Sequence, residues 1–141
     1  MLVYNKYLKE LGMKKDDFPF NRTEKKDGRY GLDKKYGIIE AQTWNLDKTI
    51  VCELYTYIRA FQDNFTFGVP CPYCNEEDGM EKWKKVIDKI VNGLKCYILA
   101  MELDSSNFKT FEDFKAEEKA LFDQFDEAWK LLGENIGCFW W

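Results

Sequence analysis

Residues 79–103, GMEKWKKVIDKIVNGLKCYILAMEL, decide the fold that we expect for this chain. Apolar side chains recur there every three or four residues, which is the spacing of one face of an α-helix. Asp78 precedes the stretch and can cap its first turn. Gly93 interrupts a run of helix-forming residues and indicates either that a neighbouring backbone approaches closely at that point or that the helix bends slightly. The apolar positions are Met80, Trp83, Val86, Ile87, Ile90, Val91, Leu94, Ile98 and Met101.

Two further stretches have the same periodicity and predict two more long helices. One runs from about Leu46 to Asn64, with Thr43 or Asn45 as its cap. The other runs from about Phe111 to Ile136, where Thr110 and Asp113 have nearly the spacing of a capping box. The apolar stripe of the first is Leu46, Ile50, Val51, Leu54, Tyr57, Ile58, Phe61 and Phe65. The stripe of the other is Phe111, Phe114, Leu121, Phe122, Phe125, Trp129, Leu132 and Ile136.

Short links between long helices favour antiparallel neighbours, so we expect an all-α fold, an antiparallel three-helix bundle over residues 45–141. Residues 1–44 form a basic N-terminal arm of the same domain, irregular or partly helical. Within it, Val3 to Leu11 predicts a short helix and Asn21 to Lys35 predicts a loop. Residues 36–44 can be extended, although the sequence offers them no partner strand.

Composition bears on the cellular compartment. No apolar run approaches the roughly 20 residues that cross a bilayer, and residues 1–15 lack the apolar core of a signal peptide. The five cysteines are an odd number, which is typical of reduced thiols. We therefore expect a cytoplasmic protein without membrane contact.

Charge is distributed unevenly along the chain. Residues 1–36 carry ten basic and six acidic side chains, and residues 37–141 carry eleven and nineteen. The acidic body disfavours binding to duplex nucleic acid. The basic arm can bind another copy, steer a charged partner or be solvated. The acidic face of the third helix can complement this arm or imitate nucleic-acid phosphates.

The chain contains no histidine, which excludes imidazole-based nucleophile systems and histidine-ligated zinc. Catalysis would have to use carboxylates, lysine, tyrosine or cysteine. We therefore expect a protein that is not an enzyme and that needs no cofactor.

Cys71-Pro72-Tyr73-Cys74 has the spacing of a glutaredoxin-type redox centre. Such a centre needs a preceding strand and a helix that starts at the first cysteine and lowers its pKa. The sequence predicts neither, so we favour a rigid turn, with a dithiol oxidoreductase as the alternative. A zinc site would need two more ligands beside Cys71 and Cys74, and we expect no metal.

Three residues at the start of the first long helix are candidate ligand-binding residues. Trp44 can stack on a flat ligand beside Asn45 and Asp47, while free amides of the first turn hold an anion. The alternative is that Trp44 packs on the first turn and that Asn45 and Asp47 cap it. Arg59 can bind a carboxylate or phosphate, or pair with an acidic neighbouring helix.

The terminal run Cys138-Phe139-Trp140-Trp141 is also a candidate binding element. Two tryptophans left in water would form a sticky patch. We expect Trp140 and Trp141 either to fold back over the bundle or to anchor a partner, which can be a second copy of the chain.

The stretch from Trp44 to Ile90 resembles a family of small uncharacterised proteins encoded by bacteriophages and prophages. The resemblance rests on a helix start at Trp44, Asn45 and Asp47, a Gly-x-Pro turn and a second helix opening with Met80 and Trp83. Further matching positions are Phe61, Gly68, Pro70, Ile87, Ile90 and the Trp140-Trp141 ending. The first helix keeps Arg59 but lacks the proline that many family members carry, and the Cys-Pro-Tyr-Cys turn is a local elaboration.

The resemblance implies a phage-encoded accessory protein. Together with the missing histidines, it leads us to expect a protein that acts in the host cell by binding. Its target is a host protein, such as a component of antiviral defence, or a nucleotide-like ligand. The alternatives are the dithiol oxidoreductase and a component of virion assembly.

Overall fold

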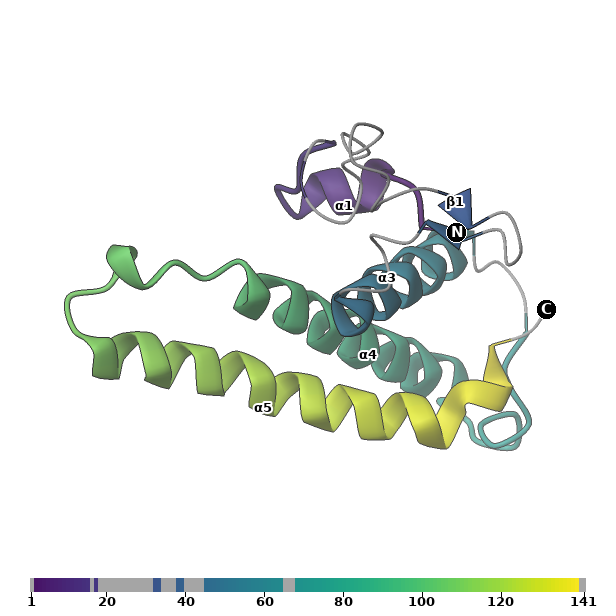
Figure 1. Cartoon of the computed structure of the whole chain (residues 1–141). Coiled ribbons are helices and arrows are strands. Elements are labelled where there is room, and N and C mark those ends of the chain that lie inside the picture. The colour runs from purple at the N-terminus through teal and green to yellow at the C-terminus, as the bar shows by residue number, and fades with distance from the viewer. Residues whose placement is uncertain are drawn as a thin grey trace. The chain divides into compact units, whose positions relative to one another are not determined.

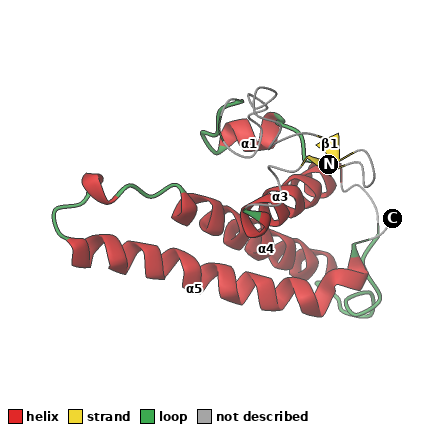
Figure 2. Cartoon of the chain, viewed as in Figure 1, coloured by secondary structure: helices red, strands yellow, loops and turns green. Residues whose placement is uncertain are grey.

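The computed structural model describes residues 2–15, 17, 32–33, 38–39, 45–64 and 68–139. The chain divides into two compact units, Met1–Thr56 and Tyr57–Trp141, which we describe separately. Helices make up most of the described residues (Figure 2), and the all-α prediction is confirmed for this part of the chain. Within the described ranges, no helix is long and apolar enough to cross a membrane.

The first unit contains a short helix, α1 (Lys6–Glu10), inside the predicted range of 3–11. Asn5 caps it, because its Oδ1 accepts hydrogen bonds from the amides of Tyr7 and Leu8 at 3.1 and 3.3 Å. The Asn5 Nδ2 also donates to the Thr56 hydroxyl at 3.1 Å. One side chain therefore both starts α1 and holds it on α3 (Leu46–Asn64). The core of this unit is Leu2, Tyr7, Leu8, Met13, Val51, Cys52 and Tyr55.

Two short strands in the same unit correct the sequence interpretation. β1 (Leu32–Asp33) pairs antiparallel with β2 (Ile38–Ile39), and Leu32 lies opposite Ile39. The extended segment predicted after residue 36 therefore has a partner, and this partner lies inside the stretch predicted as a loop. A strand of only two residues, such as Leu32–Asp33, carries too little periodic signal to be recognised from the sequence.

Helix α3 has the predicted bounds but buries a different face. Leu46 is 51% exposed, and Ile50 and Tyr57 are exposed as well. Cys52 and Tyr55, which the apolar stripe omitted, are buried. The buried positions in the first unit are rotated by about one residue from the predicted stripe, which is about 100° on a helix. Phe65 lies outside the described residues.

The second unit is built on a hairpin of two long helices, α4 (Gly79–Met101) and α5 (Phe111–Asn135), which lie side by side (Figure 1). They are antiparallel, because Cys96 packs near Leu121 whereas Tyr73, before α4, bonds Asn135 at the end of α5. A Cβ on Gly93 would lie 2.0 Å from the Ala128 Cβ. The close approach predicted at Gly93 is confirmed.

Side-chain caps start the connecting segment and α5. The Thr110 hydroxyl accepts from the Asp113 amide at 3.0 Å, as predicted. Asp104 accepts from the Ser106 amide ahead of η1 (Ser105–Asn107), and this bond lowers the pKa of the Asp104 carboxyl. Asp78 stands at the N-cap of α4 but makes no capping bond there. Its carboxylate instead lies 3.2 Å from the Lys82 ammonium.

An aromatic cluster closes the other end of the hairpin, where η2 (Ile136–Cys138) follows α5. Trp83 is 0% exposed and packs on Tyr73 and Phe139, with ring centroids 5.6 and 5.2 Å apart. Phe61 of α3 contacts Phe139 at 5.3 Å. The Trp83 Nε1 finds no hydrogen-bond acceptor within the described part of the chain.

Helix α5 also buries a face that the apolar stripe only partly matches. Its buried residues are Leu121, Ala128, Leu132 and Asn135. Phe111 and Trp129, both in the predicted stripe, are exposed. The described contacts establish the pair α4 and α5, and the complete antiparallel three-helix bundle stays a prediction.

The close approach of α4 and α5 predicts opposite effects for two glycine substitutions. Gly93→Ala should lower the free energy of unfolding by about 1–3 kcal/mol, because the new methyl group meets Ala128 and the Gln124 carbonyl. Gly133→Ala is the matched control on α5, where a Cβ meets nothing within 4 Å. Gly133→Ala should raise the free energy of unfolding by about 0.5–1 kcal/mol. Urea denaturation of both variants checks this, and equal effects would contradict the tight contact.

Candidate functional site

Four aromatic side chains form a continuous row along one flank of the hairpin, and we call Tyr97, Phe122, Phe125 and Trp129 the aromatic row. The Tyr97 ring of α4 lies 5.6 Å from Phe122 and 4.5 Å from Phe125, between centroids. Phe125 lies 5.5 Å from Trp129. The row therefore crosses from one helix to the other and then continues along α5.

The row is held in place at one end and open at the other. Tyr97 is buried, Phe122 and Phe125 are half-buried, and Trp129 is 44% exposed. Met101, one helical turn after Tyr97, is 40% exposed. Tryptophan, tyrosine and methionine are the residue types enriched where proteins bind one another, and an anchored tryptophan is a frequent hot spot. The arrangement is therefore suited to contact with a protein.

Acidic residues outnumber basic residues on α5 as a whole. The helix carries eight carboxylates and three lysines, and two of these lysines pair with Glu118 and Asp123. Asp126 follows Phe125 directly, so it lies about 100° further round the helix, beside the row. In the described structure Asp126 makes no ion pair. Its charge is therefore available to a cation on a partner.

A second aromatic cluster lies at the other end of α5. Phe114 contacts Phe108 at 5.6 Å and Phe111 at 5.9 Å between centroids. The Lys115 ammonium lies 5.7 and 5.5 Å from the rings of Phe111 and Phe114. Phe111 is 63% exposed. The exposed apolar side chains of α5 thus extend from its first residue to Trp129.

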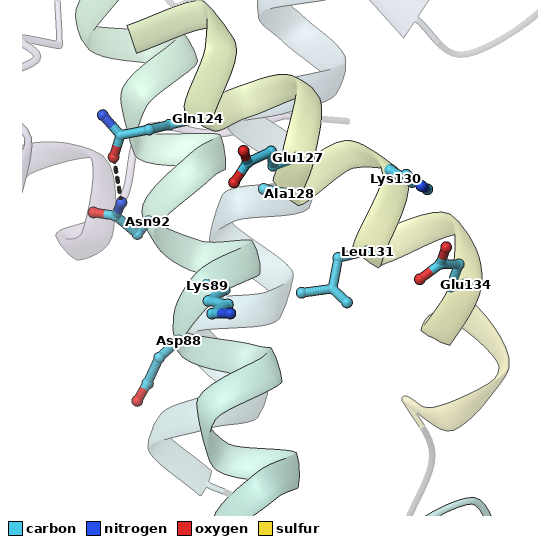
Figure 3. A pocket seen from close by; sticks show the side chains of 9 residues that line it. All are labelled: Asp88, Lys89, Asn92, Gln124, Glu127, Ala128, Lys130, Leu131 and Glu134. Atoms are coloured by element: carbon cyan, nitrogen blue, oxygen red, sulfur yellow. Dashed lines mark hydrogen bonds between the residues drawn. The ribbon is translucent and has the colours of Figure 1, made fainter. Parts of the chain in front are cut away.

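The opposite flank of the hairpin has a polar groove of about 550 Å³ (Figure 3). At one end of the groove the Asn92 Nδ2 donates to the Gln124 Oε1 at 3.1 Å and joins the two helices. Carboxylates and ammonium groups alternate along its rim, and these side chains are exposed to solvent. A small charged ligand would compete there with water. The lining residues are Asp88, Lys89, Asn92, Gln124, Glu127, Ala128, Lys130, Leu131 and Glu134.

Cys71 and Cys74 lie in a turn before α4, and both are free and exposed. Helix α4 begins at Gly79, eight residues after Cys71, so no helix start faces either sulfur. Desolvation and the neighbouring Cys71 thiol raise the pKa of the Cys74 thiol. This direction is opposite to that of an activated nucleophile. The turn that we favoured from the sequence is confirmed.

Of the residues predicted to bind a ligand, Trp44, Trp140 and Trp141 lie outside the described residues. Asn45 precedes α3 and Asp47 lies in its first turn, both exposed and both in the first unit.

Arg59 belongs to the second unit. Its guanidinium donates to Gln62 and lies 3.3 Å from Asp63 on the same helix, and Gln62 donates to Asp88 of α4 at 2.5 Å. Arg59 therefore belongs to a polar network that joins α3 and α4, but its carboxylate partner Asp63 lies on α3 itself and not on a neighbouring helix.

Comparison with known proteins returned no match: no family model, curated protein or solved structure is significantly similar to this chain.

The predicted stripe of the third helix contains Phe122, Phe125 and Trp129 only as core residues, and the predicted stripe over residues 79–103 omits Tyr97. Leu121 precedes Phe122 and Ala128 precedes Trp129, and in each pair the smaller side chain is the buried one. Gly93 was the signal in the sequence from which the buried face of α5 could have been predicted. A close approach between two helices requires small residues on the facing helix as well. Ala128 meets that requirement, and its burial turns Trp129 toward solvent.

The hydroxyl of Tyr73 predicts a pH dependence of stability. It donates to the Asn135 Oδ1 at 2.8 Å, and desolvation, followed by Cys138, Glu76 and Glu134, raises its pKa. Unfolded chains release this proton near pH 10, before the folded protein does, so stability falls as the pH rises above that value.

Tyr73→Phe removes both the proton and the hydrogen bond, which contributes about 1 kcal/mol. At pH 7 the variant should be less stable than the wild type by about that amount. The difference should shrink between about pH 9 and 11, which denaturant titration at several pH values measures. A difference that stays constant would show that the hydroxyl does not titrate as described.

Proposed function

We propose that this chain is a protein without enzymatic activity that acts by binding another protein through the aromatic row of the α4–α5 hairpin. The observation that carries the proposal is Trp129, which is 44% exposed although Phe125 holds its ring on one side. An ordered and exposed indole loses little conformational freedom when a partner covers it.

The partner that best fits this surface is an amphipathic helix with lysine or arginine beside its apolar face. Phe122, Phe125 and Trp129 lie along the axis of α5, so a helix that lies beside them can contact these rings with side chains at helical spacing. Asp126 and the other carboxylates of α5 attract cations and repel acidic segments. A cationic side chain can reach both the Trp129 ring and the Asp126 carboxylate.

The same charges weigh against a second copy as the partner. Two α5 helices that met through their aromatic rows would bring together two segments with eight carboxylates and three lysines each. Such a contact has to overcome repulsion between like charges. Self-association is therefore an outcome that the experiment below detects.

The biological setting is part of the proposal. The resemblance at Trp44, Asn45 and Asp47 supports a phage-encoded accessory protein of the host cytoplasm, with a host antiviral defence component as the bound protein. Binding of a nucleotide-like ligand depends on Trp44 and is a weaker proposal, as is a role in virion assembly. In the antiparallel three-helix bundle that we also propose, α3 would pack on α4.

Among the described residues, no observation favours the dithiol oxidoreductase. Its redox centre would need the helix start at Cys71 that α4 does not supply. The raised pKa of the Cys74 thiol is a second observation against a redox centre.

A synthetic helical peptide of leucine and lysine, arranged with one apolar face, tests the proposal. We expect micromolar binding by calorimetry, and Trp129→Ala should weaken it about tenfold or more. Asp126→Asn should weaken binding less and reduce its salt dependence.

Matched controls distinguish binding at the aromatic row from nonspecific electrostatic attraction of the peptide. A peptide with the same composition but with lysines on all sides of the helix should bind poorly. Tyr57→Ala removes an aromatic side chain that lies outside the row and is more exposed than Trp129, and Glu134→Gln removes a carboxylate on the opposite flank; both should bind like the wild type. Equal binding of both peptides, or no effect of Trp129→Ala, would contradict the proposal. Light scattering would reveal a dimer.

A further inference from the structure

The turn between α3 and α4 places two exposed thiols close together, and the proposed binding function uses neither. The Cys71 carbonyl accepts from the Cys74 amide at 3.4 Å and from the Cys74 Sγ at 3.1 Å. We infer that Cys71 and Cys74 form a reversible disulfide, and that this turn is an oxidation site for low-molecular-weight disulfides.

The backbone geometry permits this bond. A hydrogen bond from the amide of residue i+3 to the carbonyl of residue i defines a turn whose end Cα atoms lie within about 7 Å. Disulfides join Cα atoms about 4.4–6.8 Å apart. The Cys74 sulfur already points back toward Cys71. Closing the bond therefore requires side-chain rotation more than backbone movement.

The turn is also fixed from its centre. The Tyr73 amide donates to the Pro70 carbonyl at 2.8 Å, which makes a second turn overlapping the first. The Tyr73 side chain packs on Trp83 and bonds Asn135. Gly79 lies so close to Tyr73 that a Cβ on Gly79 would be 1.9 Å from the backbone carbonyl oxygen of Tyr73. These contacts hold the thiols near each other and raise the effective concentration of one for the other.

The other three cysteines have different environments. Cys52 and Cys96 are buried, and burial raises the pKa of the Cys96 thiol, which lowers its reactivity. Cys138 is half-buried and interacts with Tyr73, so it is the thiol that can compete for a bond with Cys71 or Cys74. The experiment has to distinguish these pairings.

The reaction with glutathione disulfide proceeds in two exchange steps. One cysteine of the turn, as the thiolate, attacks a glutathione sulfur, forms a mixed disulfide and releases one glutathione thiolate, which takes up a proton. The second cysteine then loses its proton and attacks the protein sulfur of the mixed disulfide, releasing the second glutathione. In total the pair loses two electrons and two protons, and one glutathione disulfide becomes two glutathione molecules.

Incubation of the full chain in glutathione buffers, followed by acid quenching and mass spectrometry, tests the inference. We expect the wild type to lose two hydrogens, to carry no glutathione at the turn and to yield a peptide with a bond between Cys71 and Cys74. Cys71→Ser and Cys74→Ser should each stop at a mixed disulfide with one glutathione. Cys138→Ser is the matched control and should oxidise like the wild type.

Two results would overturn the inference. One is a wild type that binds glutathione separately at Cys71 and Cys74 without closing the bond, and the other is a disulfide that needs Cys138. A separate measurement, the equilibrium constant for closing the disulfide, tests whether Tyr73 holds the two thiols near each other. Tyr73→Ala should lower the equilibrium constant for ring closure about tenfold. Tyr73→Phe, which keeps the ring, should lower it less; a constant unchanged in both variants would exclude the positioning by Tyr73.

Discussion

The contact between Gly93 and Ala128 determines how the hairpin is arranged. Because a Cβ on Gly93 would lie 2.0 Å from that of Ala128, the two helices meet there with almost no side-chain volume between them. This contact turns the Ala128 side of α5 toward α4 and leaves Trp129 on the flank. The same contact brings the Asn92 Nδ2 within 3.1 Å of the Gln124 Oε1 in the lining of the polar groove. The exposed aromatic row and the groove are thus two results of one close packing.

Most of the helical structure follows from the sequence, because local signals determine it. The bounds of α3 were predicted to the residue, and Thr110 forms the predicted cap of α5. The face that each helix buries was predicted less well, because the predicted apolar stripes were drawn through the large apolar residues. Ala128 on α5 and Cys52 on α3 are small and buried, whereas Trp129 and Leu46 are large and exposed. The strand pair of Leu32 with Ile39 depends on a partner distant in sequence, which periodicity does not reveal.

The candidate site was predicted in part. Pro70 and Pro72 limit the backbone in and just before the Cys71–Cys74 segment and indicated a turn, and the turn is confirmed. The pairing of its thiols depends on Tyr73, whose contact with Asn135 spans 62 positions of the chain and gives no local signal. Arg59 was placed on the correct helix, but its acidic partner Asp63 lies on α3 itself instead of on a neighbouring helix.

Trp83 combines a buried ring with a polar group that has no partner among the described residues. Its ring is fully enclosed, yet its indole nitrogen meets no acceptor among the described residues. A buried donor without an acceptor costs about 1–3 kcal/mol, which partly offsets the gain from burying so large a ring. A proton acceptor introduced next to this nitrogen would stabilise the fold without any change to the exposed flanks. The centre of the aromatic cluster is therefore a place where this protein can be made more resistant to heat.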